Sequence, residues 1–301
     1  MDNVQKLLNE FLINQYNDDL IRKIFDGYNI NRKTTVRVNS IKANLKDIEL
    51  ILEQNKIIFN HVPWYNDALI IENVDEEKIR SLDIYKKGQI YLQSLSSMLP
   101  PLVLSPKSRE SILDMAAAPG SKTTELSALS NNEALIMAVE KNKIRADRLR
   151  HNLDSQGAKK VNVLEADARN LDDMFKFDKI LLDAPCSGSG TINLNDKNIE
   201  KYFTRELVER SSKTQKELIN KAINLLKVNG ELVYSTCSIF KCENEDVVNF
   251  VLKNSNIELV SIDESLFKDI PLLPVSIDGT ICVCPNEFYE GFFVAKFRKI
   301  R

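Results

Sequence analysis

The stretch KILLDAPCSGSG, residues 179–190, is an apolar run that stops at Asp183 and continues through a proline into Cys186. A short apolar run bounded by turn-forming residues predicts a buried β-strand. The stretch ELVYSTCS, residues 231–238, has the same character and ends at Cys237. A cysteine that serves only packing more often lies inside a strand than at its tip. The two strand ends therefore predict a functional role for both thiols.

The pattern around these two strands predicts the fold. From residue 112 onward, short apolar runs alternate with amphipathic helical segments, which is typical of βαβ units and a parallel sheet. Strands are expected over residues 111–115, 134–140, 161–167, 179–186, 231–238, 257–263 and 290–297. Helices are expected over residues 121–130, 142–157, 205–230 and 243–254. We therefore predict an α/β, Rossmann-like fold whose doubly wound, mostly parallel sheet has seven strands.

The first hundred residues have a different pattern, which predicts a small α+β module. Its expected elements are a helix over residues 4–16, a strand over 34–41, a helix over 44–55 that Asn44 caps, and a strand over 68–74. The segment SMLPPLVLSPKSRE, residues 97–110, carries three prolines and predicts a junction. The expected domains are a module over residues 1–100 and a catalytic domain over residues 101–301.

Composition limits the class of protein. Hydrophobic residues make up 43% of the 301 residues and charged residues 28%, as in ordinary globular proteins. No apolar run approaches the roughly 18 residues of a membrane span, and the start lacks the pattern of a signal peptide, so we expect a cytoplasmic protein. Five cysteines form no regular disulfide framework. The net charge of −2 does not indicate nucleic-acid binding, although a local basic patch can still supply the phosphate contacts. We expect a monomer.

The carboxyl ends of the predicted strands carry acidic side chains. In an open parallel sheet ligands bind beyond these ends, where the strand order reverses. The acids are Asp114, Glu140, Asp167 and Asp183, and the loop after the first strand is MAAAPGSK, residues 115–122. This loop has one glycine, so it is neither a dinucleotide fingerprint nor a P-loop. A nucleoside without a pyrophosphate fits better, and S-adenosylmethionine is the common one. Glu140 is placed to bind its ribose.

Three interpretations of Cys186 and Cys237 compete. A zinc site would need closely spaced thiolates and histidines, but the chain has only His61 and His151, so no metal is expected. A redox pair is conceivable, but a disulfide across the mouth would block the acids below it. A nucleophilic thiol with a second thiol as helper uses both positions together with the cofactor.

A thiol beside a methyl donor suits one reaction in particular. Carbon 5 of a pyrimidine is too weak a nucleophile to attack a methyl sulfonium unaided. Addition of a thiolate to carbon 6 makes carbon 5 nucleophilic, and after methyl transfer a base removes the carbon 5 proton and the thiolate leaves. Asp183 is placed to hydrogen-bond ring nitrogen 3 during addition. Cysteine suits the task because its thiolate is both a strong nucleophile and a good leaving group.

Four segments carry a resemblance to a known family. They are LDMAAAPGSKTTELSAL, LLDAPCSGSGT, YSTCSIFKCENEDVV and the terminal GFFVAKF. Together they resemble the motifs of the NOL1/NOP2/Sun (Fmu) family of RNA cytosine-5 methyltransferases, from about Tyr91 to the C-terminus. The segment TTVRVNSIK, residues 34–42, resembles that family's N-terminal RNA-binding region. The order of the two cysteine motifs makes the match specific.

The resemblance implies a class I methyltransferase fold and roles for individual residues. It implies that Cys237 is the nucleophile, that Cys186 helps to release the product and that Asp183 assists catalysis. The cofactor-binding residues that it implies are Ala116, Ala117, Ala118, Pro119, Gly120, Ser121, Lys122, Glu140, Arg145, Asp167 and Asp183. Two positions depart from the family pattern: Ala116 replaces a usual cysteine and Ser121 a usual glycine. Both replacements are small, so we expect altered affinity rather than lost function.

A basic stretch in the first module is the expected RNA contact. The candidate residues are Arg32, Arg37, Asn39 and Lys42. The target base must leave its stack, which costs least in a loop, so a structured RNA with an exposed cytosine is the expected substrate. Ribosomal RNA is the first expectation and tRNA the second. A non-catalytic RNA-binding assembly factor and a methyltransferase acting on a small molecule or protein are the rivals.

Overall fold

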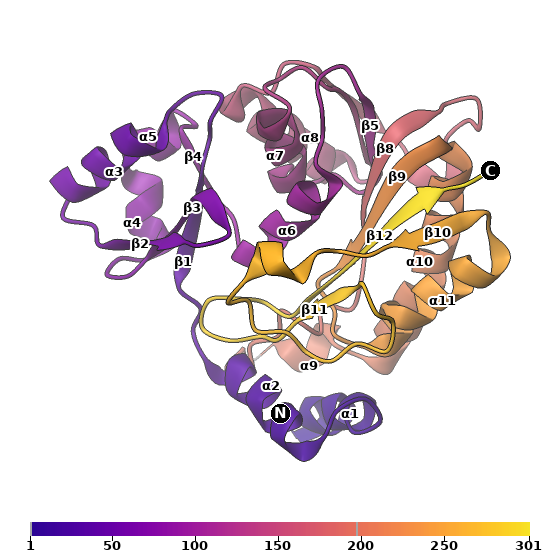
Figure 1. Cartoon of the computed structure of the whole chain (residues 1–301). Helices are drawn as coiled ribbons and strands as arrows, with labels where there is room; N and C mark the ends of the chain where they lie inside the picture. Colours follow the sequence, from indigo (N-terminus) through magenta and orange to yellow (C-terminus); the bar gives the residue numbers. More distant parts are fainter. Residues whose placement is uncertain (1, 197) are drawn as a thin grey trace.

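The computed structural model describes residues 2–196 and 198–301, and a mixed β-sheet forms its centre (Figure 1). Within these residues the sheet has eight strands: β5 (Ser111–Asp114), β6 (Leu135–Glu140), β7 (Val161–Glu165), β8 (Phe177–Asp183), β9 (Leu226–Thr236), β10 (Ile257–Val260), β11 (Ile281–Val283) and β12 (Phe292–Lys299). The strand order is β10-β12-β9-β8-β5-β6-β7, and β11 pairs with β12. Strands β9, β8, β5, β6 and β7 are parallel, whereas the β10–β12 edge is antiparallel. The predicted α/β fold is confirmed.

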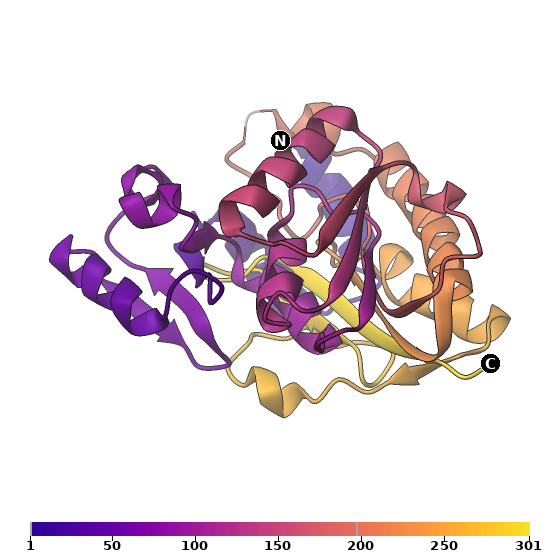
Figure 2. The ribbon, with the colours of Figure 1, turned by 90° about the horizontal axis from the view of Figure 1, so that it is seen from above.

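Helices cover both faces of this sheet (Figures 1 and 2). One layer holds α6 (Leu95–Leu104), α7 (Ser121–Leu129) and α8 (Lys143–Gln156), and the other holds α10 (Arg205–Leu225) and α11 (Glu245–Asn254). The short elements are α9 (Ile199–Tyr202) and the 3₁₀ turns η1 (Ala168–Asn170), η2 (Lys241–Glu243) and η3 (Glu264–Phe267). This two-layer cover explains why the parallel strands are apolar on both faces.

Strand β8 shows how the sequence pattern builds the two cores. Ile180 and Leu182 lie in the cluster on the α10 face, whereas Leu181, between them, lies in the cluster on the α6 face. All three side chains are fully buried, as the alternation of side chains along a strand requires. The apolar run ends at Asp183 because the strand emerges there from the core.

The small module has a four-stranded antiparallel sheet in the order β2-β3-β1-β4. Its elements are β1 (Thr34–Val38), α3 (Leu45–Gln54), β2 (Phe59–Val62), β3 (Tyr65–Ile71), α4 (Glu76–Ser81), α5 (Asp83–Lys86) and β4 (Ile90–Leu92). Asn44 caps α3 as predicted, and its side chain accepts a hydrogen bond from the Asp47 amide. The sequence pattern does not predict β2, β4, α4 and α5, because these elements are short.

Three segments depart from the sequence analysis. The helix predicted over residues 4–16 is α1 (Asp2–Leu12), followed by α2 (Asp18–Asn29), and both contribute to the apolar cluster on the α10 face rather than to that of the small sheet. The predicted junction with its prolines is helix α6, buried against α7 and the sheet, with Pro100 and Pro101 inside it. Strand β9 begins at Leu226, five residues before the predicted start, because Leu226 pairs with Phe177 of β8. The domain division at residue 100 stays a prediction.

The length and hydropathy of each helix determine whether it could cross a membrane. No helix among the described residues is both long and apolar enough to cross a membrane.

Candidate active site

The functional side chains gather at the carboxyl edge of the parallel strands. Strand β5 lies at the centre with β8 on one side and β6 on the other, so the strand order reverses between β5 and β8. Asp114, Glu140 and Asp183 end three of these strands, and Cys237 directly follows β9. This is the edge at which ligands bind in doubly wound sheets.

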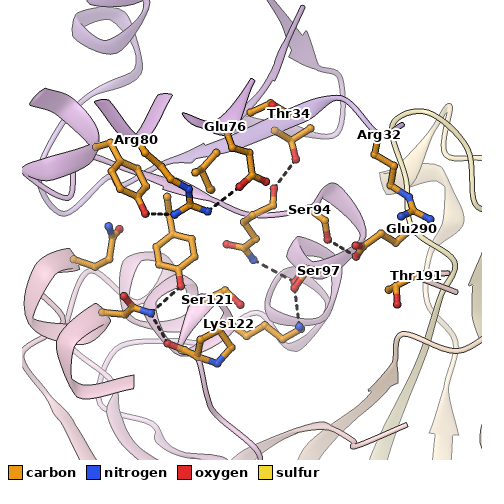
Figure 3. Close-up of a pocket in the computed structure, with 18 of the residues that line it drawn as sticks. Arg32, Thr34, Glu76, Arg80, Ser94, Ser97, Ser121, Lys122, Thr191 and Glu290 are labelled. Carbon is orange, nitrogen blue, oxygen red and sulfur yellow. Dashed lines mark hydrogen bonds and ion pairs between the residues drawn. The ribbon is translucent and has the colours of Figure 1, made fainter. Parts of the chain in front are cut away.

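Two hollows lie at this edge, on either side of the loop over residues 115–122. The larger is a cleft of about 1240 Å³ between the small module and the sheet, lined by Lys122, Asp183 and Cys237. The smaller contains Ala116, Glu140 and Asp167. In Figure 3, Glu76 and Arg80 lie on the small-module wall of the cleft, with Ser121 and Lys122 opposite. The loop over residues 115–122 and the end of strand β8 therefore lie between a small acid-lined pocket and a larger cleft.

The smaller pocket suits an adenosine because two acids flank an apolar floor. Glu140 is buried and accepts a hydrogen bond from the Asn142 amide. The Nε atom of Arg145 lies 3.5 Å from Glu140, and its guanidinium donates to the Ala118 carbonyl. The apolar lining comes from Met115, Ala116, Val139, Ala166, Pro185 and Leu218. Carboxylates can accept hydrogen bonds from the ribose hydroxyls, and an apolar slot beside them can take an adenine ring.

Asp167 is paired with an arginine that the sequence analysis missed. The Arg169 guanidinium makes two hydrogen bonds to the Asp167 carboxylate, of 2.6 and 3.0 Å, and a further one to Glu217. The Arg169 hydrogen bonds lower the pKa of Asp167 to about 2. Asp167 is therefore ionised at neutral pH and stays fixed at the mouth of the smaller pocket, which Arg169 also lines.

Some residues of the loop over residues 115–122 are buried and support its backbone, whereas others line the two hollows. Ala117 and Ala118 are buried in the small cluster that includes Leu149 of α8. Gly120 has φ +107°, and a side chain there would come within 2.9 Å of Leu149, so glycine is required. Ala116 faces the smaller pocket, whereas Pro119, Ser121 and Lys122 line the cleft. Asp114 lies below the loop, buried, and Thr123 donates to its carboxylate.

The two thiols meet. Sγ of Cys186 lies 3.1 Å from Sγ of Cys237, and both are free cysteines. Cys237 is half-buried and lines the cleft. The hydrogen bond to Cys237 and burial raise the pKa of Cys186 well above its ordinary value. Cys186 therefore keeps its proton at neutral pH, and a protonated thiol is a poor nucleophile.

An ion pair lies beside Cys237. The Lys122 ammonium is 2.7 Å from one carboxylate oxygen of Asp183, and the Ser235 hydroxyl donates to the other oxygen at 2.8 Å. Burial lowers the pKa of Lys122, but Asp183 and then Cys237 outweigh it, so the pKa lies above its ordinary value. Lys122 is thus a fixed positive charge on the cleft side of the loop rather than in the smaller pocket. Its ammonium also donates to Ser97 (Figure 3).

The expected RNA-contact residues lie in different environments. Arg32 is half-buried and lines the cleft, and its guanidinium donates to the Gly190 and Ile192 carbonyls. Lys42 is exposed and donates to the Lys87 and Ser155 carbonyls.

Arg37 and Asn39 do not fit the expected RNA contact, because both are enclosed by protein. Arg37 donates to Gln93 and to Thr124 of α7, and Asn39 donates to the Gly88 and Gln156 carbonyls. They join the small sheet to the α7–α8 layer. A basic residue within an apolar strand carries no sequence signal for burial of this kind.

The metal-site interpretation of the two thiols can be compared with the arrangement of metal-binding side chains in the structure. Within residues 2–196 and 198–301, no group of three or more His, Cys, Asp or Glu side chains is arranged to hold a metal ion. Cys237 lines the cleft that also contains the Lys122–Asp183 ion pair, and Cys186 lies in contact with it. The site therefore has a thiol, a neighbouring cation and room for an aromatic base.

The strand order and the two helix layers are those of the class I, Rossmann-like methyltransferase fold. Residues 101–298 match the family described as 16S rRNA methyltransferase RsmB/F, and the chain belongs to this family. It is 37% identical over 279 residues to the tRNA (cytosine(49)-C(5))-methyltransferase of Pyrococcus abyssi, with 89% of each chain covered.

Two further comparisons agree. The chain is 35% identical over 274 residues to the ribosomal RNA small subunit methyltransferase F of Shewanella amazonensis, which covers 89% of this chain but only 58% of that relative. The chain thus spans just over half the length of this curated relative. The crystal structure of a methyltransferase homologue from Pyrococcus horikoshii is 33% identical with a TM-score of 0.80, covering 92% of this chain and 90% of that one.

Proposed function

We propose that the protein is an S-adenosylmethionine-dependent RNA cytosine-5 methyltransferase that works through a covalent bond between Cys237 and its target base. The observation that carries this proposal is the contact between Cys237 and Cys186 in a cleft beside an acid-lined pocket. A non-catalytic RNA-binding protein would have no use for two touching thiols with a buried lysine beside them. We further expect a monomer that acts in the cytoplasm.

The smaller pocket is the proposed cofactor site. Ala116, Glu140, Asp167 and Pro185 would hold S-adenosylmethionine, with Arg145 and Arg169 fixing the two acids. When bound, it supplies an electrophilic methyl group. The alanine at position 116 faces this pocket, so the departure from the family's usual cysteine leaves an apolar contact in place.

Lys122 and Asp183 prepare the addition step. The Lys122 ammonium is a positive charge close to Cys237, and its ion pair holds Asp183 in the cleft that Cys237 lines. Asp183 is held at both oxygens, by Lys122 and by Ser235, so its carboxylate has a fixed direction toward the cleft. A fixed carboxylate next to the bound base stabilises the protonated ring nitrogen 3 that forms as sulfur adds.

The two thiols divide the work. Cys237 lines the cleft that would receive the base, so we assign the attacking sulfur to Cys237. Addition joins Sγ of Cys237 to carbon 6, carbon 5 takes the methyl group, and loss of the carbon 5 proton with departure of the thiolate restores the ring. Cys186 lies 3.1 Å from the sulfur that leaves, so it is placed to assist that last step.

The cleft is the proposed base and RNA site. Its volume of about 1240 Å³ is ample for a nucleotide turned out of its stack and for part of the flanking strand. Arg32, Lys33, Arg148 and His151 line it and can meet phosphates. Ribosomal RNA is the first proposed substrate, because the family is described as a 16S rRNA methyltransferase family. Transfer RNA is the second, because the archaeal tRNA enzyme matches over 89% of both chains.

Bisulfite sequencing of total RNA tests the function. RNA from a strain that lacks the gene is compared with RNA from the same strain carrying either the intact chain or the Cys237→Ser variant. The expected result is one cytosine that resists conversion only when the intact chain is present. Equal conversion at every cytosine in all three samples would reject the proposal, and the position found would name the RNA.

A further inference from the structure

A buried carboxylate joins the two loops that carry the thiols. Glu243, the last residue of η2, is fully buried and belongs to neither loop. One of its oxygens accepts hydrogen bonds from the Ser187 amide at 2.7 Å and from the Gln215 side chain at 3.2 Å. The other accepts from the Ser187 hydroxyl at 2.5 Å and from the Ser238 hydroxyl at 2.6 Å. One side chain therefore holds both loops.

The positions of these two serines give the contact its meaning. Ser187 directly follows Cys186, and Ser238 directly follows Cys237. Both hydroxyls point at the same oxygen of Glu243, so the residues next to the two thiols are fixed to a common point. The sulfurs of the two cysteines that these serines follow lie 3.1 Å apart.

The two loops also touch directly, but farther from the sulfurs along the first loop. The Gly190 amide donates to the Cys237 carbonyl, and the Ser189 and Ser238 hydroxyls share a hydrogen bond of 2.8 Å. Gly190 packs so closely on Gly291 that a side chain at position 190 would lie 1.9 Å from the Gly291 carbonyl oxygen. These contacts hold one end of the loop pair, and Glu243 holds the end next to Cys186.

The cost of this arrangement argues that it serves a purpose. The partners that the structure gives to Glu243 are neutral groups, Ser187, Ser238 and Gln215. Burial raises its pKa, and the serine hydrogen bonds offset part of that rise. A buried carboxylate without a cationic partner lowers stability unless hydrogen bonds compensate. A neutral residue would join the loops with less desolvation but fewer acceptor positions.

We propose that Glu243 is a positioning residue that holds Cys186 and Cys237 in contact by fixing the residue after each of them. It does not touch the reacting atoms. The proposal deepens the proposed function, because the contact matters only if the two thiols act together. The Glu243 side chain holds the two loops because it is long enough to bond to both of them, and its charge is not required.

Oxidation of the two thiols provides a distance measurement that needs neither RNA nor cofactor. Diamide takes two electrons and two protons from a pair of thiols and leaves a disulfide, at a rate that depends on how often the sulfurs meet. The full chain is treated with diamide, quenched by alkylation at set times and mapped by peptide mass spectrometry. The Cys186–Cys237 disulfide is followed separately from Cys242, Cys282 and Cys284.

Four variants distinguish the effect of side-chain length at position 243 from the effect of its charge. Glu243→Ala removes the bridge, and Glu243→Asp keeps the charge but is one methylene too short to hold both loops. Both are expected to slow disulfide formation at least tenfold. Glu243→Gln keeps the reach, because its oxygen can face the Ser187 amide while its amide group donates to the two hydroxyls, so less than threefold slowing is expected. The matched control is Glu245→Ala, a buried glutamate two residues on that contacts the Ser276 amide, with a change under twofold.

The outcomes decide the matter. Wild-type rates in Glu243→Ala, or a wild-type rate in Glu243→Asp with a slow Glu243→Gln, would overturn the proposal. Should Glu243→Ala fail to fold in circular dichroism, the Ser187→Ala/Ser238→Ala double variant removes the two hydroxyl links instead and must show the same tenfold slowing. Otherwise the proposal is rejected.

Steady-state kinetics of the Glu243→Ala variant test whether the contact between the two thiols matters for turnover. With 16S rRNA transcript or unmodified tRNA transcript as acceptor, Glu243→Ala is expected to lower kcat at least tenfold and to leave KM for S-adenosylmethionine within twofold. An unchanged kcat would contradict the role. If the wild-type chain methylates neither transcript, the proposed function is in question, whereas the oxidation rates still test the role of Glu243.

Discussion

The chain holds two cysteine pairs, and they lie in opposite environments. Cys186 and Cys237 follow the carboxyl ends of adjacent parallel strands, touch each other, and lie beside a buried lysine. Cys282 lies in β11 and Cys284 just after it, and both are buried within the apolar cluster on the α10 face.

The difference lies in the setting of the thiols and not in their chemistry. Desolvation raises the pKa of Cys284 to about 11 and holds that of Cys282 higher still, and the Tyr16 hydroxyl is 3.9 Å from Cys282. A buried thiol of this kind behaves as a small apolar side chain. Position at a strand end, open to a cleft and next to a cation, is what makes the first pair chemically useful.

Loss of the attacking sulfur should have the largest effect. Cys237→Ser is expected to lower methyl transfer more than about a thousandfold, because a hydroxyl there is far less nucleophilic than a thiolate. Tritium transfer from labelled S-adenosylmethionine to RNA measures this, and circular dichroism checks the fold. Retained turnover would reject the assignment of Cys237.

Cys186→Ser should arrest the reaction after the bond to the base has formed. A protein–RNA adduct is expected to accumulate as a band that survives denaturing electrophoresis, while turnover falls about a hundredfold. The double variant Cys186→Ser/Cys237→Ser must show no such band. An adduct that persists in Cys237→Ser and is lost in Cys186→Ser would exchange the two roles.

Lys122→Gln tests whether the cation distinguishes the pairs. Without the ammonium, Asp183 loses its ion pair and the thiolate loses its neighbouring positive charge. A fall of about ten- to a hundredfold in kcat is expected. A matched surface change, Lys143→Gln, should leave kcat within twofold.

Cys282→Ser should change stability rather than activity. The serine hydroxyl would replace a thiol in the apolar cluster, so the free energy of unfolding is expected to fall by about 1–3 kcal/mol. Urea unfolding measures this, with kcat unchanged. A loss of activity in the folded variant would place Cys282 in the site.

The smallest effect is a difference in labelling. At pH 8 and with brief exposure, iodoacetamide is expected to modify Cys237 before Cys282 and Cys284, because Cys237 alone of these three lies in the cleft. Peptide mapping gives the order. Equal labelling of Cys237 and Cys282 would remove the contrast on which the comparison depends.

Local patterns predicted much of this structure, and the failures share a cause. The acids at Asp114, Glu140 and Asp183 were found because a strand end is marked by a change from apolar to polar residues. Glu243 and Arg169 were missed because each also binds a residue from a distant segment, Ser187 and Glu217 respectively, which sequence spacing does not reveal.

Arg37 shows the same limit from the opposite side. Within β1 it alternates with Val36 and Val38, which point into the small core, so its own face reads as solvent. The second body that covers this face, helix α7, lies almost ninety positions along the chain. The sequence pattern of a strand does not show that its outer face is covered by a distant segment. Here the packing of the small sheet on α7 has to be known first.

The buried Arg37 has a consequence for how the two walls of the cleft can move. Its guanidinium is shared among Gln93, Thr124 and the nearby Glu125 carboxylate, all out of water. Separation of the small sheet from α7 would remove Thr124 and Glu125 from a buried charge, at a cost of several kcal/mol. We therefore expect the two walls of the cleft to keep their spacing. Under the proposed function, an RNA would have to adapt its own conformation to that spacing.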